Sequence, residues 1–259
     1  MSERAPLARD GAVATVTVTR PEARNALDGA TLDALLHAFA AIERDGAIRC
    51  AILTGAGDRA FVAGADIKAM SGLEPFGARS FSEHGRRVCD LIEGLSVPVI
   101  AAANGWALGA GLELALACDF IYAARGAKLG FPEVGLGVIP GMGGTQRLIG
   151  RVGVARAREL IYSAAVIDAD EAARIGLVNA VVEPAELLAR VRAVAAAVVR
   201  QAPLAVDAAK RAILRGGDLP LKSGVDFEQQ LFAALFASAD QEEGMRAFVE
   251  KRAPAWSGK

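Results

Sequence analysis

One stretch of the chain decides the fold: residues 97–124 read VPVIAAANGWALGAGLELALACDFIYAA. The run is long and apolar enough to suggest a membrane span, but Glu113 and Asp119 lie within it. A carboxylate near the middle of a bilayer is costly, so we reject the span. Glycines divide the run instead into the elements of a globular domain: a strand over 98–103, a turn at Gly105, a helix over 108–117 and a strand over 119–123.

Strands and helices alternate through the first two-thirds of the chain. Val and Thr alternate with Ala over residues 12–19, as in a strand, and Asp28 is the expected N-cap of a helix with one apolar face. The further elements that we predict are a strand over 51–54, a glycine-rich loop over 61–66, a helix over 77–94, a loop over 126–141, helices over 142–150, 154–163 and 169–175, and a strand over 177–182. Such alternation favours an α/β layered core.

The last part of the chain is predicted to be almost entirely helical. Helices are expected over 185–200, 204–215 and, with breaks, 221–251. The last of these carries apolar stripes, among them Leu231 and Leu235, and no later strand follows to cover them. We expect such a tail to pack on the parent domain or on another subunit.

The composition is that of a globular protein with a large core. Of 259 residues, 53% are hydrophobic and 23% are charged, which excludes extensive disorder. The formal net charge of -1 argues against a protein built mainly to hold nucleic acid, because phosphate binding needs an excess of Lys and Arg.

The cysteines and the first residues bear on the cellular compartment. Cys50, Cys89 and Cys118 lie far apart and form no CxxC pair, so we interpret them as reduced thiols of a cytoplasmic protein. Residues 1–10 are polar and lack the apolar segment of a secretory signal, which agrees with that interpretation.

Three segments contain the candidate chemistry: FVAGADIK at 61–68, NGWALGAGLE at 104–113, and FPE at 131–133 leading to PGMGGTQR at 140–147. The first two place small residues directly after a strand, so that backbone amides can approach a ligand closely. Gly109–Gly111 also opens a helix, where unpaired N–H groups favour a developing negative charge. Two such loops that converge would form an oxyanion hole. The alternative, that these glycines only permit tight turns, stays open on the sequence alone.

Two glutamates are candidates for acid–base chemistry. Glu113 lies in an otherwise apolar helix, where a carboxylate needs partners or a perturbed protonation equilibrium, and Glu133 follows Pro132 in a loop. Paired carboxylates can hold a water molecule and divide acid and base duties. Exposed positions for both are the alternative, because spacing alone does not show that they meet.

His37 and His84 have no nucleophile or metal-ligand partners in the sequence, so we interpret them as structural or surface residues.

In this order and at this spacing, the three segments resemble those of the enoyl-CoA hydratase/isomerase (crotonase) family. The resemblance runs from RPEARNAL at 20–27 to EKR at 250–252. It implies an α/β fold, a crotonase-like spiral of ββα turns with a helical C-terminal region. It also implies a spiral core over 1–200, a trimerisation region over 201–259, and assembly as a homotrimer or a dimer of trimers.

The resemblance assigns roles to individual residues. The backbone amides of Ala65 and Ala110 would form the oxyanion hole, and Glu113 and Glu133 would hold the water. Many family members have Gly at the position of Ala110, but only the backbone donor is needed. The residues expected to bind CoA are Arg24, Ala26, Ala63, Asp66, Ile67 and Lys68, together with Phe248 and Lys251 reaching a neighbouring subunit. A structural part is expected for the turn at 143–145 and for Asp66.

The implied activity is that of a lyase in fatty-acid β-oxidation, which adds water reversibly to a trans-2-enoyl-CoA and gives a 3-hydroxyacyl-CoA. No metal or redox cofactor is expected, since coenzyme A is part of the substrate. Retention of both glutamates favours hydration over the alternative of isomerisation or another acyl-CoA reaction on the same fold.

Two remoter alternatives have less support. NGWALGAG superficially resembles the dinucleotide-binding turn of a nicotinamide-dependent dehydrogenase, but it begins past residue 100, far from the first strand. A non-catalytic RNA-binding protein is disfavoured by the near-neutral charge and by the two glutamates.

Overall fold

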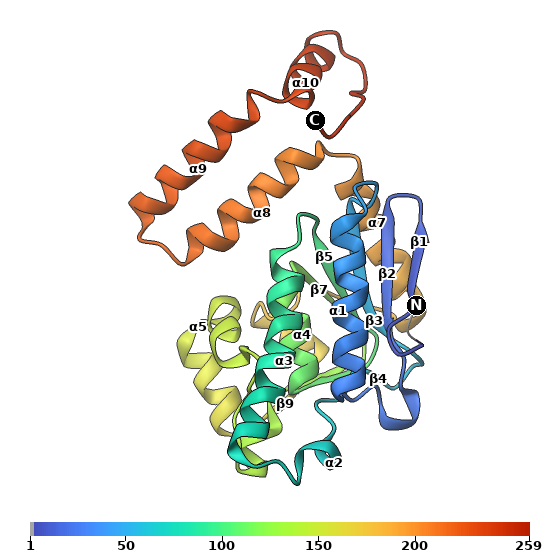
Figure 1. Cartoon of the computed structure of the whole chain (residues 1–259), viewed down its shortest axis with the longest axis vertical. Coiled ribbons are helices and arrows are strands. Elements are labelled where there is room, and N and C mark those ends of the chain that lie inside the picture. Colours follow the sequence, from blue (N-terminus) through green and yellow to red (C-terminus); the bar gives the residue numbers. More distant parts are fainter. Residues whose placement is uncertain (1–2) are drawn as a thin grey trace.

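The structure, a computed structural model, describes residues 3–259 as a mixed α/β body from which a helical arm projects (Figure 1). The larger sheet has the strand order β1-β2-β3-β5-β7-β10. Its β1–β2 pairing is antiparallel and its other pairings are parallel. The strands are Leu7–Asp10, Val13–Val18, Cys50–Gly55, Val99–Ala103, Phe120–Ala124 and Ala180–Val182, in that order.

A second, smaller sheet has the order β4-β6-β8-β9. Its strands are Ala60–Val62, Trp106–Leu108, Lys128–Gly130 and Val166–Asp168. The β4–β6 and β6–β8 pairings are parallel, so the carboxyl ends of these three strands lie at one edge of the sheet. The three segments singled out in the sequence each leave the sheet at that edge.

Three successive turns of the chain each add one strand to each sheet and then a helix. β3 and β4 lead through the short α2 (Ile67–Met70) to α3 (Pro75–Gly94). β5 and β6 lead to α4 (Ala110–Ala117), and β7 and β8 lead to α5 (Gly144–Tyr162). This repeat confirms the predicted spiral of ββα turns.

The larger sheet is buried on both faces, as is usual for parallel strands. Successive side chains of β3 point to opposite faces. Ala51 and Leu53 join the main core, which also contains the buried face of α1 (Gly29–Arg44). Cys50 and Ile52 instead pack against α7 (Leu187–Val199) in a second, smaller core.

The N-terminal helix α1 forms as the sequence predicts. The Asp28 side chain accepts a hydrogen bond from the Thr31 amide over 2.8 Å and caps the helix. The apolar face of the helix is buried through Leu32, Leu35, Phe39 and Ile42. The predicted strand over 12–19 is equally clear as β2, with alternating buried and half-buried residues.

Several short elements differ from the prediction. The expected loop over 126–141 contains β8 and the 3-10 helix η2 (Pro132–Leu136), and the expected loop over 61–66 begins inside β4. The helix expected from residue 108 begins at Ala110, because the preceding residues pair with β4 and β8 as β6. Three-residue strands are too short to show a period of two in the sequence.

The remaining helices of the body agree with the prediction within a few residues. The predicted break between 150 and 154 occurs within α5 at Gly153, where φ is 75°. After β9 comes α6 (Ala169–Arg174), and 3-10 helices cover Pro21–Ala23 (η1) and Pro184–Glu186 (η3).

The arm consists of α8 (Pro203–Gly217), α9 (Leu221–Leu235) and α10 (Ala239–Val249), with α8 and α9 side by side (Figure 1). Every residue of α9 is at least partly exposed. Large apolar side chains are exposed along the arm: Ile213, Leu221, Phe232, Phe236, Phe248 and Val249. The predicted boundary at residue 200 falls between α7 and α8, although a separate trimerisation domain stays a prediction.

Within residues 3–259, no helix is long and apolar enough to cross a membrane. The stretch 97–124 is divided into β5, β6, α4 and β7, of which β6 was not predicted.

Candidate active site

Glu113 lies in the first turn of α4 and is only 1% exposed. Its Oε1 atom accepts hydrogen bonds from the backbone amides of Met142 and Gly144, each over 2.7 Å. Burial raises the pKa of Glu113, whereas these two amides oppose the rise because they stabilise the carboxylate. The alternative of an exposed glutamate on this helix was therefore wrong.

Glu133 lies in the first turn of η2, directly after the carboxyl end of β8. Its Oε2 atom is buried and, among the residues that the structure describes, has no hydrogen-bond partner. Burial raises the pKa of Glu133 to about 7, its own backbone amide opposes this, and the nearby charge of Glu113 adds to the rise. A buried polar atom without a partner costs about 1–3 kcal/mol, which marks it as a candidate for binding another molecule.

The two carboxylates lie at the same end of α4. A Cβ atom on Gly109, the residue before the helix, would lie 2.7 Å from Glu133 Oε1. One on Gly144 would lie 2.9 Å from Glu113 Cγ. Glycine at both positions therefore leaves room for the carboxylates, and the structure brings together the pair that sequence spacing left open.

The amides of Ala65 and Ala110 lie on two loops that touch. Leu27 forms a parallel bridge with Ala65 by donating to Gly64 O over 2.9 Å and accepting from Asp66 N over 2.8 Å. Because this bridge uses the groups on either side of Ala65, its own N–H faces away from Leu27.

Ala110 is the first residue of α4, where amides lack partners inside the helix. A Cβ on Gly111 would clash with the carbonyl of Val62 in β4. One on Gly64 would lie 3.6 Å from Leu108 O. These close approaches place the loop of Ala65 beside the start of α4.

The predicted CoA-binding residues near the N-terminus gather around that loop. Ala63 donates its amide to Arg24 O over 3.1 Å, and the Arg24 guanidinium lies 4.9 Å from the centre of the Trp106 ring. Ile67 and Lys68 are exposed at the start of α2. The carbonyl of Ala26 accepts a hydrogen bond from the Arg20 guanidinium over 3.1 Å.

The Asp66 carboxylate already has internal partners. It caps α2 by accepting from Lys68 N and Ala69 N, and it pairs with Arg20 over 2.7 Å. The structural part that we expected for this residue is therefore visible. Arg20 and the buried Asn25 were quoted in the sequence only as part of the stretch 20–27, and no role was predicted for either. In the structure Asn25 donates to Ala60 O over 2.8 Å.

Phe248 and Lys251 lie apart from the other predicted residues. Both belong to the end of the arm, which is far from α2 and α4 in Figure 1, and Phe248 is 85% exposed. Within one chain the structure does not bring them to the glutamates. Their contact with the CoA of a neighbouring subunit stays a prediction.

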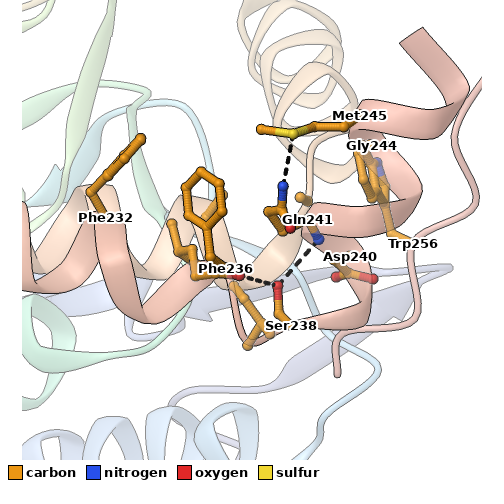
Figure 2. Close-up of a pocket in the computed structure, with 12 residues that line it drawn as sticks. Phe232, Phe236, Ser238, Asp240, Gln241, Gly244, Met245 and Trp256 are labelled. Carbon is orange, nitrogen blue, oxygen red and sulfur yellow. Dashed lines mark hydrogen bonds between the residues drawn. The ribbon is translucent and has the colours of Figure 1, made fainter. Parts of the chain in front are cut away.

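The arm also contains an apolar pocket, lined by Phe232, Phe236, Met245 and Trp256 among others (Figure 2). Its one titratable lining residue, Asp240, accepts hydrogen bonds from the amides of Ser257 and Gly258. The pocket therefore offers a packing surface rather than acid–base chemistry. Among residues 3–259, no group of three His, Cys, Asp or Glu side chains is arranged to hold a metal ion.

Comparison with known proteins identifies the family. The model of the enoyl-CoA hydratase/isomerase family matches residues 8–259. The chain belongs to this family. It is 47% identical to the short-chain-enoyl-CoA hydratase of Clostridium acetobutylicum over 246 residues, which cover 95% of this chain and 94% of that protein. It is 48% identical to the crotonyl-CoA hydratase of Syntrophomonas wolfei, with 95% of each chain covered.

A solved structure extends the likeness of this enoyl-CoA hydratase/isomerase family member to three dimensions. The crystal structure of an enoyl-CoA hydratase from Bacillus anthracis matches it with a TM-score of 0.96 and 40% identity, over 99% of this chain and 100% of that chain. Both the family and the fold class predicted from the sequence are thus confirmed.

Sequence reasoning missed part of the site in this family member. The turn at 143–145 was given only a structural part, yet the Gly144 amide contacts Glu113 directly. The signal available in the sequence was the pair of adjacent glycines at 143–144. The structure shows why glycine is needed there, because a Cβ on Gly144 would lie 2.8 Å from the Phe131 ring. Arg147, which contacts the same turn, was also not singled out.

Proposed function

We propose that the protein is an enoyl-CoA hydratase, which adds water reversibly to a trans-2-enoyl-CoA and forms a 3-hydroxyacyl-CoA. One observation carries the proposal: Glu113 and Glu133 lie together at the start of α4 but differ in their hydrogen bonds. The relatives named short-chain-enoyl-CoA hydratase and crotonyl-CoA hydratase support the same reaction.

In this proposal the thioester carbonyl binds between the amides of Ala65 and Ala110. Negative charge builds on the carbonyl oxygen when water attacks Cβ, because the electrons of the double bond move toward the thioester. Backbone donors aimed at that oxygen act most strongly in the transition state. The N-terminus of α4 adds a favourable dipole at the same place.

The unequal hydrogen bonding of the two glutamates supports a division of roles. Two amides stabilise the ionised form of Glu113, so this carboxylate takes a proton from the attacking water. Glu133, with its raised pKa, holds a proton and delivers it to Cα. One proton is thereby accepted and one donated, and proton exchange after product release restores both groups. The two carboxylates titrate as a coupled pair.

Hydration explains the second carboxylate better than isomerisation does. Moving a double bond takes a proton from one carbon and returns it to another, a task for which one carboxylate suffices. Activation of water needs a base in addition to the acid that serves Cα. Comparing a 2-enoyl-CoA with a 3-enoyl-CoA as substrate distinguishes the two reactions.

Substrate binding and assembly form the finer part of the proposal. Arg24, Ala26, Ala63, Asp66, Ile67 and Lys68 would lie along the CoA moiety, and Phe248 and Lys251 would contact the CoA of a neighbouring subunit. A homotrimer or dimer of trimers would cover the exposed apolar residues of the arm. The proton transfers require no metal or redox cofactor. The buried free cysteines support a cytoplasmic location.

The test is hydration of crotonyl-CoA, followed by the loss of absorbance of the conjugated thioester. We expect saturable turnover by the wild-type protein and a loss of roughly 10²- to 10⁴-fold in kcat for Glu133→Gln. Glu183→Gln, which changes an exposed glutamate, is the matched control and should behave as wild type. Normal turnover in a folded Glu133→Gln variant would refute the assignment.

A further inference from the structure

Arg147 ties α5 to α3 at the edge of the proposed active site. Its Nε and Nη2 atoms donate to the two carboxylate oxygens of Glu93 over 3.1 and 2.9 Å. Nη2 also donates to Asp90 over 3.2 Å. The Arg147 side chain is 14% exposed and that of Glu93 27%, so this is a partly buried, bidentate ion pair.

The same guanidinium also contacts the turn before α5. Nη1 of Arg147 donates to Met142 O over 2.9 Å. The amide of that same Met142 donates to Glu113, as does the amide of Gly144. Met142 therefore links Arg147, which its carbonyl contacts, to Glu113, which its amide contacts.

The turn is also held by the buried Met142 side chain and by Gly143 O, which accepts from the amides of Gln146 and Arg147. Gly143 has a φ of 108°, a conformation that residues with a side chain rarely adopt, and a Cβ there would clash with Arg147 Nη1. The side chain of Ser82 on α3 donates to Gly141 O, one residue before the turn. Apart from Glu113 itself, Arg147 is the side chain that, among the described residues, hydrogen-bonds to the backbone between Met142 and Gly144.

We propose that Arg147 is a positioning residue, which holds the turn 142–144 so that the amides of Met142 and Gly144 stay on Glu113, the base of the proposed hydration. This inference rests on the proposed function and extends it to a residue that does not touch the substrate. The guanidinium acts through backbone geometry and through its charge.

The charged surroundings of Glu113 give the direction of the effect. The titratable groups around it come from three elements: Cys89, Asp90 and Glu93 on α3, Arg147 on α5, and Glu133 on η2. Arg147 is the cation of this set and lowers the pKa of Glu113 against the effect of burial. Removal of Arg147 takes away this positive charge and leaves the negative charges of Asp90 and Glu93 unneutralised. It also weakens the hydrogen bonds from the Met142 and Gly144 amides to Glu113. Each change favours the protonated form of Glu113.

A purely structural ion pair would behave differently. It would lower thermal stability when broken but would leave the protonation of Glu113 unchanged. Arg151 provides the matched control, because it lies one turn further along α5 and donates to the carbonyls of Cys118 and Asp119 over 2.9 and 3.0 Å. It does not contact the turn 142–144.

The experiment measures kcat and KM for crotonyl-CoA against pH in wild type, Arg147→Gln, Arg147→Lys, Glu93→Gln and Arg151→Gln. We expect Arg147→Gln to lower kcat by about tenfold or more, to change KM by less than about threefold, and to move the acid limb of the profile to higher pH. Arg147→Lys keeps the positive charge but loses the bidentate contact with Glu93. Its kcat and its acid limb should therefore lie between those of wild type and Arg147→Gln. Glu93→Gln frees the guanidinium but also removes a negative charge from the surroundings of Glu113, so it should lower kcat while moving the acid limb less than Arg147→Gln does.

The Arg151→Gln variant is expected to lose stability with an unmoved acid limb. If Arg147→Gln does not fold, Arg147→Lys provides the same test. Wild-type acid limbs in the folded Arg147 variants, or an equal shift in Arg151→Gln, overturn the inference.

A second readout separates this inference from the proposed function. Infrared difference titration of the Glu113 carboxyl, made in the Glu133→Gln background, follows its protonation without any turnover. We expect its titration to move to higher pH when Arg147→Gln is added. Failure of the wild-type protein to hydrate crotonyl-CoA would refute the proposed function, whereas an unmoved titration would refute the part assigned to Arg147.

Discussion

Gly144 donates its amide to Glu113 over 2.7 Å, and the same residue has no room for a side chain. An added Cβ would lie 2.8 Å from the Phe131 ring and 2.9 Å from Glu113 Cγ. The glycine therefore serves the carboxylate twice, by giving it a hydrogen bond and by leaving it space.

The first prediction concerns this contact. Gly144→Ala should lower kcat by about tenfold or more and destabilise the fold by about 1–3 kcal/mol, because the methyl group forces the turn away from Glu113. Steady-state kinetics and thermal melts measure both effects. Gly150→Ala is the control on the same helix, since a Cβ there meets open space among the described residues. It should be neutral or slightly stabilising. Equal behaviour of the two variants would contradict the steric argument.

The reach of sequence reasoning is clear from α1 and from the small sheet. Asp28 and the apolar face behind it predicted a helix correctly, because capping and periodicity are local signals. The strands β6 and β8 were missed because each has only three residues. Their pairing depends on partners that lie far apart in the sequence.

The site was predicted to a similar extent. Glu113 was recognised because a carboxylate in an apolar helix is conspicuous, and the resemblance supplied Glu133. Their meeting depends on the parallel strands β6 and β8, which place the two following segments at one edge. The turn that binds Glu113 was undervalued because a donor on the backbone has no signature of its own in the sequence.

The second prediction concerns the cooperation of the two glutamates. Glu113→Gln and Glu133→Gln should each lower kcat by roughly 10²- to 10⁴-fold. The double variant should lose much less than the product of the two factors, because neither group completes the reaction alone. Single-turnover measurements with crotonyl-CoA test this, with Glu183→Gln as control. Strictly multiplicative losses would show that the two residues act independently.

The third prediction concerns stability and pH. Burial raises the pKa of Glu133 from 4.5 to about 7, so the folded protein holds its proton where the unfolded chain has lost it. The contribution of this group to stability is therefore fully present below about pH 4.5 and is lost as the pH rises through about 7. Glu133→Gln cannot ionise and escapes that loss.

The melting temperature of Glu133→Gln relative to wild type should accordingly be higher at about pH 8 than at about pH 5. Melts followed by circular dichroism across this range measure the difference. Glu183→Gln, which alters an exposed carboxylate, should show no such trend. A constant difference between Glu133→Gln and wild type at every pH would contradict the raised pKa.

The last prediction concerns the joint between the arm and the body. Lys210 on α8 donates to Val97 O over 3.1 Å and pairs with Asp119 over 2.9 Å, and its side chain is 6% exposed. Lys210→Met leaves the Asp119 carboxylate with the Val99 amide but without its cation, which should cost about 3 kcal/mol. Because this contact ties α8 to the strands of the body, the arm should loosen first.

Limited proteolysis should then cleave within α8–α10 before the body, whereas Lys222→Met, at an exposed position on α9, should be cleaved as slowly as wild type. Unchanged cleavage of Lys210→Met would show that the apolar contacts of α8 hold the arm without this ion pair.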